Sequence, residues 1–197
     1  MTTTMLLRDD PLAALNQRLS TPARNLGEPG PTAEQLDQLL SAAIRVPDHG
    51  KLTPWRMLLV RGDARIRLGE RLADIHARIE PDVSPSKLAK DRERYSFAPL
   101  IVVVIARIDE ENPKVPVQEQ ILSAGCVAYN LLIGAQAIGM AAQWLTGWAA
   151  YDADAAALFG LSGNERIVAF VHIGTPREPM PERTRPLLGD VVGEWRG

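Results

Sequence analysis

The stretch PLIVVVIARI, residues 99–108, decides the fold expected for this chain of 197 residues. It is a nearly continuous run of β-branched and other apolar residues, with no polar residue before Arg107. Such a run is typical of a strand that is buried on both faces. We therefore expect it to lie in the middle of a sheet that helices cover on both sides.

Helices and strands are predicted on both sides of this run, without a regular strand-helix-strand repeat. The spacing of apolar residues predicts helices over 11–19, 31–46, 63–79, 115–140 and 153–161, and a partly helical segment over 84–97. Short apolar runs predict further strands over 55–61, 141–148 and 166–176. This order favours an α+β fold, a mixed α/β sheet flanked by helices, in one domain that spans residues 1–197.

The two ends of the chain differ from this pattern. After Pro176 the sequence becomes rich in proline and charge, so residues 176–197 are expected to form an extended C-terminal arm over a surface. Residues 1–10, MTTTMLLRDD, have no long apolar stretch of the kind that a signal peptide needs.

Composition and charge exclude several function classes. With 46% hydrophobic and 23% charged residues, the chain has the composition of a folded globular protein. A net charge of −2 gives no general attraction for nucleic acid, and no run reaches the ~18 apolar residues of a membrane-spanning helix. The single cysteine, Cys126, allows no internal disulfide and lies in a helical apolar pattern, where a buried structural role is favoured over a nucleophilic one. These features predict a cytoplasmic protein that binds neither nucleic acid nor membranes.

The predicted helix over residues 115–140 is apolar almost all round and rich in alanine and glycine. A helix of this kind needs packing partners on several sides. A dimer interface would supply such partners.

Motifs for nucleotide, metal or nucleophile chemistry are missing from the sequence. No G-x-G-x-x-G follows a predicted strand, and no phosphate loop or G-x-S-x-G turn is present. The three histidines, His49, His76 and His172, are far apart and lack the spacing of zinc ligands, so no metal site is predicted.

The stretch RVPDHGKLTPWR, residues 45–56, is the most informative for function. Pro47, Asp48 and Gly50 indicate a loop between a helix and a strand, from which His49 and Lys51 would project. Loops in such positions often build ligand sites. The alternative, in which His49 only caps or solvates the turn, stays open.

This segment resembles the loop of the nitroreductase-like flavoproteins that leads through Pro-Trp and a basic residue into a strand and touches FMN. It is most similar to the small branch of that family that includes the bacterial YdjA-type proteins. Further matching segments follow in the family's order: R-L-S at 18–20, V-P-x-x-E-Q-x-x-S-A-G at 115–125, W-L-T-G at 144–147, I-G-T-P at 173–176 and E-R-T-R-P at 182–186. Together they cover nearly the whole chain.

The resemblance implies an FMN-dependent nitroreductase-like fold and a domain-swapped type of homodimer, with one FMN at each of two sites in the interface. Carried over residue by residue, it implies an FMN site made by Arg18, Leu19, Ser20, Arg45, His49, Trp144, Leu145, Thr146, Arg183 and Arg185.

Within this site, Arg18 and Ser20 match phosphate-contacting residues, whereas Leu19 replaces the family's usual second arginine. A guanidinium group and a hydroxyl group both bond phosphate oxygens well. Arg183 and Arg185 match a late basic pair that also reaches phosphate, with ordinary solvated charges as the alternative.

The remaining positions match contacts to the flavin. Arg45 would stabilise the negatively charged reduced flavin, although a charge near a helix C-terminus could also serve the helix dipole. The segment 144–146 matches a strand end beside the flavin ring, with core packing as the alternative for Trp144. Lys51 and Thr53 depart from the Asn and Gln common in larger nitroreductases, which leaves substrate preference open.

The resemblance thus implies an FMN-dependent NAD(P)H oxidoreductase working by a ping-pong cycle. Hydride passes from the nicotinamide to flavin N5, the nicotinamide leaves, and a nitroaromatic, quinone or similar small-molecule electron acceptor takes its place. No side chain is predicted to be a catalytic residue, because the flavin carries the chemistry. Two alternatives stay open: a reductase for one specific metabolite, with residues 80–97 as a lid, and a protein that stores or senses FMN with little turnover.

Overall fold

The computed structural model describes residues 12–197. The expectation for residues 1–10, and the first residue of the helix predicted over 11–19, lie outside this range. The helix itself is the single turn α2 (Ala13–Asn16), shorter than the apolar spacing predicts.

A sheet of five strands forms the centre of the described chain. The strands are β1 (Leu26–Gly27), β2 (Trp55–Arg61), β3 (Leu100–Arg107), β4 (Ala141–Leu145) and β5 (Glu165–Pro176). Every pairing is antiparallel. β5 pairs with β3 along one edge, and with β4 and then β1 along the other. β3 therefore lies between β5 and β2, as its apolar run predicts.

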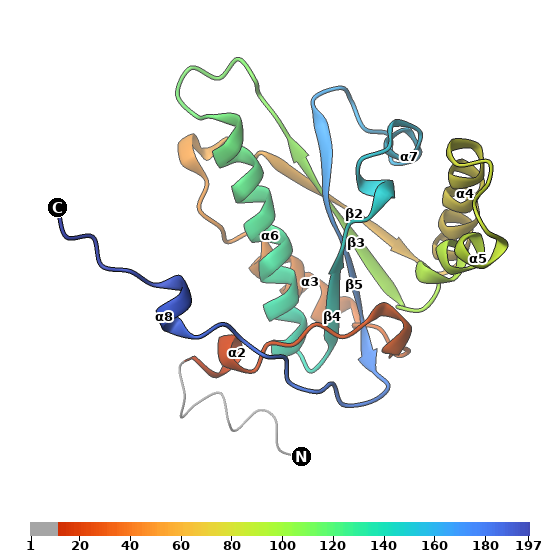
Figure 1. Cartoon of the computed structure of the whole chain (residues 1–197), viewed down its shortest axis with the longest axis horizontal. Coiled ribbons are helices and arrows are strands. Elements are labelled where there is room, and N and C mark those ends of the chain that lie inside the picture. The colour runs from red at the N-terminus through yellow and green to blue at the C-terminus, as the bar shows by residue number, and fades with distance from the viewer. Residues whose placement is uncertain (1–11) are drawn as a thin grey trace.

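Helices cover both faces of this sheet (Figure 1). On one face lie α3 (Ala33–Ala43) and α6 (Val117–Ala137); on the other lie α4 (Asp63–Ile79), α5 (Pro85–Arg94) and α7 (Ala153–Leu158). Side chains of β3 alternate between the two layers, with Val102 and Val104 packed toward α6 and Ile101 and Val103 toward α4. All four are fully buried, which explains why β3 reads as a continuous apolar run.

The ends of the helices follow from local sequence. α3 begins with a capping box, in which the Thr32 hydroxyl accepts from the Gln35 N–H and the Gln35 side chain accepts from the Thr32 N–H. α6 ends before Gly139, whose φ of 81° favours glycine. Short 3₁₀ turns at Ala23–Asn25, His49–Lys51 and Trp148–Ala150, and the short helix α8 (Leu188–Val191), were not predicted.

The prediction that Cys126 is buried is wrong, because its side chain is exposed. α6 packs one side on the sheet through residues such as Val127 and Leu131, which are fully buried. Its other side is open, with Leu122 57% and Tyr129 41% exposed. The apolar pattern around Cys126 therefore reflects a second, uncovered face of α6.

The C-terminal segment leaves β5 and runs back past α2 (Figure 1). The Arg177 N–H donates to the Asn25 carbonyl at 2.8 Å, and the Arg185 side chain donates to the Arg18 carbonyl at 3.2 Å. Beyond this contact Trp195 is 93% exposed. Within residues 12–197, no helix has both the length and the apolar character needed to cross a membrane.

Candidate functional site

The loop between α3 and β2 has an unusual backbone. Gly50, Lys51 and Thr53 have φ values of 72°, 55° and 49°, in the left-handed region that a β-branched residue such as threonine rarely enters. The Asp48 carboxylate holds this shape by accepting from the N–H groups of Leu52 and Thr53, both at 3.0 Å. Strain of this kind is often found at functional sites.

Side chains of α6 fasten the start of the same loop. The Ser123 hydroxyl donates to the Pro47 carbonyl at 2.5 Å. The Asn130 amide donates to the Arg45 carbonyl at 3.2 Å. Ser123, in the segment 115–125, and Asn130 thus hold the start of this loop against α6.

His49 is fastened in the same way, but through its side chain. Its Nδ1 lies 2.7 Å from Oε2 of Glu119, in the first turn of α6. The His49 and Glu119 side chains are 58% and 48% exposed, so the pair remains open to a ligand. The Arg45 side chain is exposed as well.

A second group of predicted residues meets where the two ends of the described chain come together. Arg18 donates from Nη1 to the Ser20 hydroxyl at 3.1 Å, and Arg185 donates to the Arg18 carbonyl across 167 residues of sequence. Glu182 accepts from the Arg183 N–H at 3.0 Å and from Arg185 at 2.9 Å. The Arg183 N–H, and then the Arg185 guanidinium, lower the pKa of Glu182, so this carboxylate is ionised beside the arginines.

The segment after Ser20 leads from this cluster to a cavity at the end of β4. The Thr21 N–H donates to the Ala142 carbonyl at 3.0 Å, and the Ala23 N–H donates to Gln143 Oε1 at 2.6 Å. The cavity has a volume of about 640 Å³ and is lined by residues 22–24, residues 143–147, and Lys90, Glu93, Arg94 and Phe97. This volume lies within the range of about 300–1,000 Å³ that small-molecule sites occupy.

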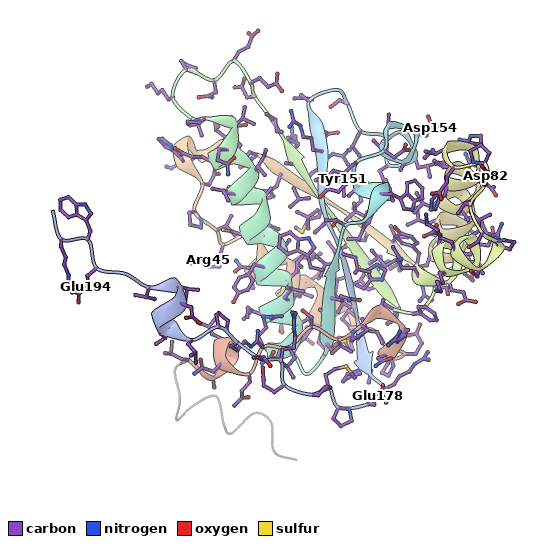
Figure 2. The ribbon with its side chains drawn as sticks, in the orientation of Figure 1. Arg45, Asp82, Tyr151, Asp154, Glu178 and Glu194 are labelled. Atoms are coloured by element: carbon purple, nitrogen blue, oxygen red, sulfur yellow. The ribbon has the colours of Figure 1, made fainter. Side chains whose placement is uncertain are left out.

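The predicted site residues fall into separate places on one chain. Trp144, Leu145 and Thr146 line the cavity. The cluster of Arg18, Ser20, Arg183 and Arg185, with Leu19 half-buried within it, does not line the cavity but precedes it along the chain. Arg45 and His49 belong to neither group, and Figure 2 shows Arg45 on the side of α6 away from α4 and α5.

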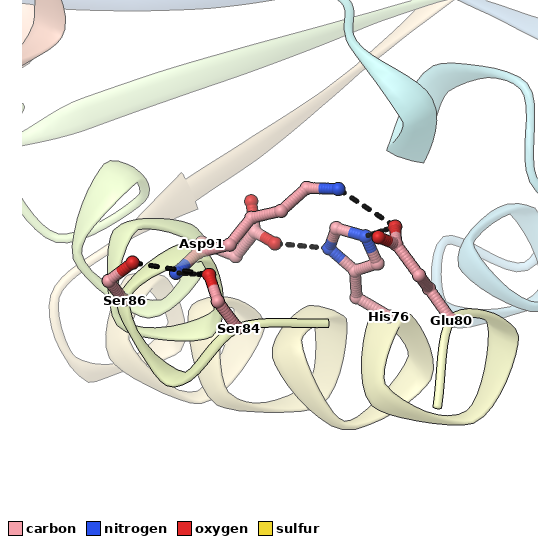
Figure 3. A network of polar contacts seen from close by, with 6 residues as sticks. His76, Glu80, Ser84, Ser86 and Asp91 are labelled. Carbon is pink, nitrogen blue, oxygen red and sulfur yellow. Dashed lines mark hydrogen bonds and ion pairs between the residues drawn. The ribbon is translucent and has the colours of Figure 1, made fainter. Parts of the chain in front are cut away.

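The position of α5, which forms one wall of the cavity, is fixed by a buried polar contact with α4 (Figure 3). Nδ1 of His76 bonds the Asp91 carboxylate, and both residues are buried. Nε2 of His76 lies 3.2 Å from Glu80, which also accepts from Lys87 at 2.8 Å. The Trp148 ring packs on the His76 ring with centroids 4.7 Å apart. A buried, fully bonded pair of this kind orients two helices closely.

Several cavity residues were not predicted, namely Arg24, Lys90, Glu93, Arg94, Phe97 and Gln143. The signal that could have found part of them is the charge density of SPSKLAKDRERYSF, residues 84–97. The sequence predicts residues 84–97 only as a partly helical segment, and residues 80–97 as a lid for one alternative function.

The donor groups present fit the FMN that the resemblance implies. Two guanidinium groups and a hydroxyl group within one cluster match the oxygen acceptors of a phosphate. The cavity beyond it, walled partly by Phe97, Trp144 and Leu145, suits a flat, largely apolar ring.

The chain is similar in sequence to known proteins. The model of the Nitroreductase family matches residues 15–175. A Haemophilus influenzae protein with the provisional name NAD(P)H nitroreductase is 36% identical over 89% of this chain and 94% of its own length. YdjA of Escherichia coli, also provisionally named as an NAD(P)H nitroreductase, is 36% identical over 85% of this chain and 89% of its own length.

Solved structures show the same fold. A nitroreductase-like protein from Bacillus cereus superposes with a TM-score of 0.80 at 21% identity, over all of both chains. A Desulfovibrio desulfuricans nitroreductase solved in complex with FMN superposes with a TM-score of 0.72 at 22% identity, over 94% of this chain and 98% of the other. The predicted α+β fold and the predicted class of oxidoreductase enzyme are thereby confirmed. The chain belongs to the nitroreductase family.

Proposed function

We propose that this protein is an FMN-dependent NAD(P)H oxidoreductase that reduces nitroaromatic, quinone or similar acceptors by a ping-pong mechanism. The observation that carries the proposal is the meeting of Arg18, Ser20 and Arg185 directly ahead of the cavity at the end of β4. The provisional names of the Haemophilus and Escherichia relatives, and the FMN in the Desulfovibrio structure, support it.

In this proposal each group of residues has a distinct task. Arg18, Ser20, Arg183 and Arg185 hold the FMN phosphate, and residues 144–146 lie beside its ring. FMN, when bound, supplies the hydride chemistry between NAD(P)H and the acceptor. The protein therefore orients the partners and tunes their charge, and no side chain acts as a nucleophile.

Arg45 and His49 join the site from a second copy of the chain in a homodimer. Two observations favour this arrangement. Both residues lie outside the cavity and the phosphate cluster of their own chain. The nearby face of α6 leaves Leu122 and Tyr129 exposed, and an exposed apolar face of this kind is typical of a protein–protein interface. Residues 1–197 then act as one domain, whose arm over 176–197 brings Arg183 and Arg185 to the site.

Steady-state kinetics of the FMN-loaded protein test this function. NAD(P)H oxidation is followed at several fixed concentrations of a quinone, and double-reciprocal plots are expected to give parallel lines, as a ping-pong cycle requires. Intersecting lines would contradict the shared site. Bound FMN without turnover of any nitro or quinone acceptor would contradict the enzyme and favour storage or sensing of FMN.

A further inference from the structure

Three basic side chains line the cavity at the end of β4, namely Arg24, Lys90 and Arg94. Glu93 is the one acidic residue among the lining residues, so the lining carries a net charge of about +2. Among residues 12–197, none of the three basic side chains makes a hydrogen bond or an ion pair. The cavity thus carries a net positive charge, and its three basic side chains form no ion pair with the described chain.

Arg94 is the most constrained of the three. Its side chain is half-buried, whereas Arg24 and Lys90 are exposed. Its Nη1 lies 3.5 Å from the point where a Cβ on Gly147 would be, so the missing side chain leaves space in front of the guanidinium. Gly147 has a φ of 69°, a conformation that favours glycine in this place.

A half-buried cation with no partner loses hydration without recovering that free energy. The charge of Arg94 also acts on His172, a buried residue of β5. Burial first, and then Arg94, lower the pKa of His172 to about 3, so this buried histidine is neutral and adds no second positive charge beside Arg94. An anionic group from outside the chain would complete the environment of Arg94.

The rest of the cavity indicates what carries this anion. In the proposed function the flavin ring lies beside residues 144–146, so the ring and Phe97 form an apolar wall of the remaining cavity, next to the positive wall of the basic side chains. The His76–Asp91 contact fixes α5 on α4 (Figure 3). The helix that carries Lys90 and Arg94 is therefore in place before any ligand binds. A flat aromatic body with a negative substituent matches both walls.

We propose that the cavity binds aromatic acceptors that carry a carboxylate or another anionic substituent, with Arg94 as the main anion contact and Lys90 in support. This inference rests on the proposed function, because it names the substrate class of the same site. The phosphate groups of FMN and NADPH share the anionic chemistry, so the test uses FMN-loaded protein and has to separate donor from acceptor.

Binding and turnover of a matched pair of acceptors provide the test. 4-Nitrobenzoate and 4-nitrobenzamide differ in charge but little in shape. Calorimetric titration of the FMN-loaded protein gives their dissociation constants, and steady-state assays give kcat/KM. We expect the wild type to favour the benzoate about tenfold, the usual size for one charge-assisted contact in a partly solvated site.

Substitutions then locate the effect. Arg94→Gln is expected to lower the ratio from about ten to about two to three, the part that Lys90 supplies, and the exposed Lys90→Gln to lower it about two- to threefold. Arg92→Gln is the matched control, since Arg92 is an exposed arginine of the same helix that does not line the cavity, and it should keep the wild-type ratio.

Two results would overturn the inference. The first is equal binding of the two acceptors by the wild type. The second is an unchanged acceptor ratio in Arg94→Gln with a raised KM for NADPH but not for NADH, which would assign the cations to the donor. If the protein binds the benzoate preferentially but reduces neither acceptor, the proposed function fails while the binding preference stands.

Discussion

Replacing Arg18 with glutamine removes one charged contact that we assign to the FMN phosphate. Arg18 is half-buried, its Nη1 lies 3.1 Å from the Ser20 hydroxyl, and its carbonyl is bonded by Arg185. A hydrogen bond to a charged group contributes about 1.5–3 kcal/mol, and partial exposure favours the lower end. Arg18→Gln should therefore weaken FMN binding about 10- to 30-fold.

The assay compares FMN with riboflavin, which lacks the phosphate. Apoprotein is titrated with each flavin, and binding is followed by the change in flavin fluorescence. If Arg18 contacts the phosphate, the substitution weakens FMN binding and leaves riboflavin binding nearly unchanged. The ratio of the two dissociation constants thus separates a phosphate contact from a general loss of structure.

Arg196→Gln is the control for this experiment, because Arg196 is 85% exposed and its recorded ion pair is with the neighbouring Glu194 at 3.8 Å. It should bind both flavins as the wild type does. Equal weakening of FMN and riboflavin in Arg18→Gln, or no weakening of either, would refute the assignment of the phosphate site.

Three further predictions concern the scaffold around the site. Gly69→Ala should lower the free energy of unfolding by about 1–3 kcal/mol, measured in urea, because a Cβ there would clash with the carbonyl oxygen of Arg92 and push α5 from α4. The pKa of His172 is about 3 in the folded protein and about 6.5 in the unfolded chain, so unfolding takes up a proton as pH falls and the wild type should lose about 2 kcal/mol of stability between pH 7 and 5. His172→Leu should abolish this loss. Glu165→Gln should destabilise the fold by about 1–2 kcal/mol near pH 7, and the difference should shrink as pH falls from 4.5 toward 2, since Arg56 holds the pKa of Glu165 at about 2.

Matched variants keep these three predictions open to contradiction. Gly163→Ala has no atom within 4 Å of the new Cβ and should leave stability nearly unchanged, so a similar loss there would refute the α4–α5 clash. An unchanged pH slope in His172→Leu would contradict the second prediction. Arg166→Gln breaks an exposed ion pair with Glu110 and should change stability little. A loss of stability as large as that of Glu165→Gln would show that the Arg56–Glu165 pair contributes no more than an exposed pair does.

The sequence predicts elements well where the signal is local. The run over residues 99–108 has the composition that a strand between two helical layers needs, and β3 occupies that place. Thr32 and Gln35 supply a capping box that can be read from four consecutive residues. Such signals depend on contacts between near neighbours in the chain.

Other features depend on contacts that the sequence does not reveal. Arg18 and Arg185 meet across 167 residues, and only the fold brings them together. Cys126 is exposed because no other described element covers that face of α6, although the same apolar pattern would suit a fully buried helix. The positive φ values of Lys51 and Thr53 occur in a turn where the Asp48 carboxylate accepts from the N–H groups of Leu52 and Thr53, a contact that residue type alone does not specify. Arg94 was missed as a site residue because its place beside Gly147 depends on how α5 packs.

An absorption spectrum of the purified protein, repeated anaerobically after addition of NADPH or NADH, tests the assigned cofactor and its reduction together. We expect the two visible bands of bound FMN, and their bleaching by the reduced nicotinamide. A colourless protein that FMN cannot reconstitute would contradict the assigned cofactor site. Bands that persist after both nicotinamides are added would contradict the proposed reductase.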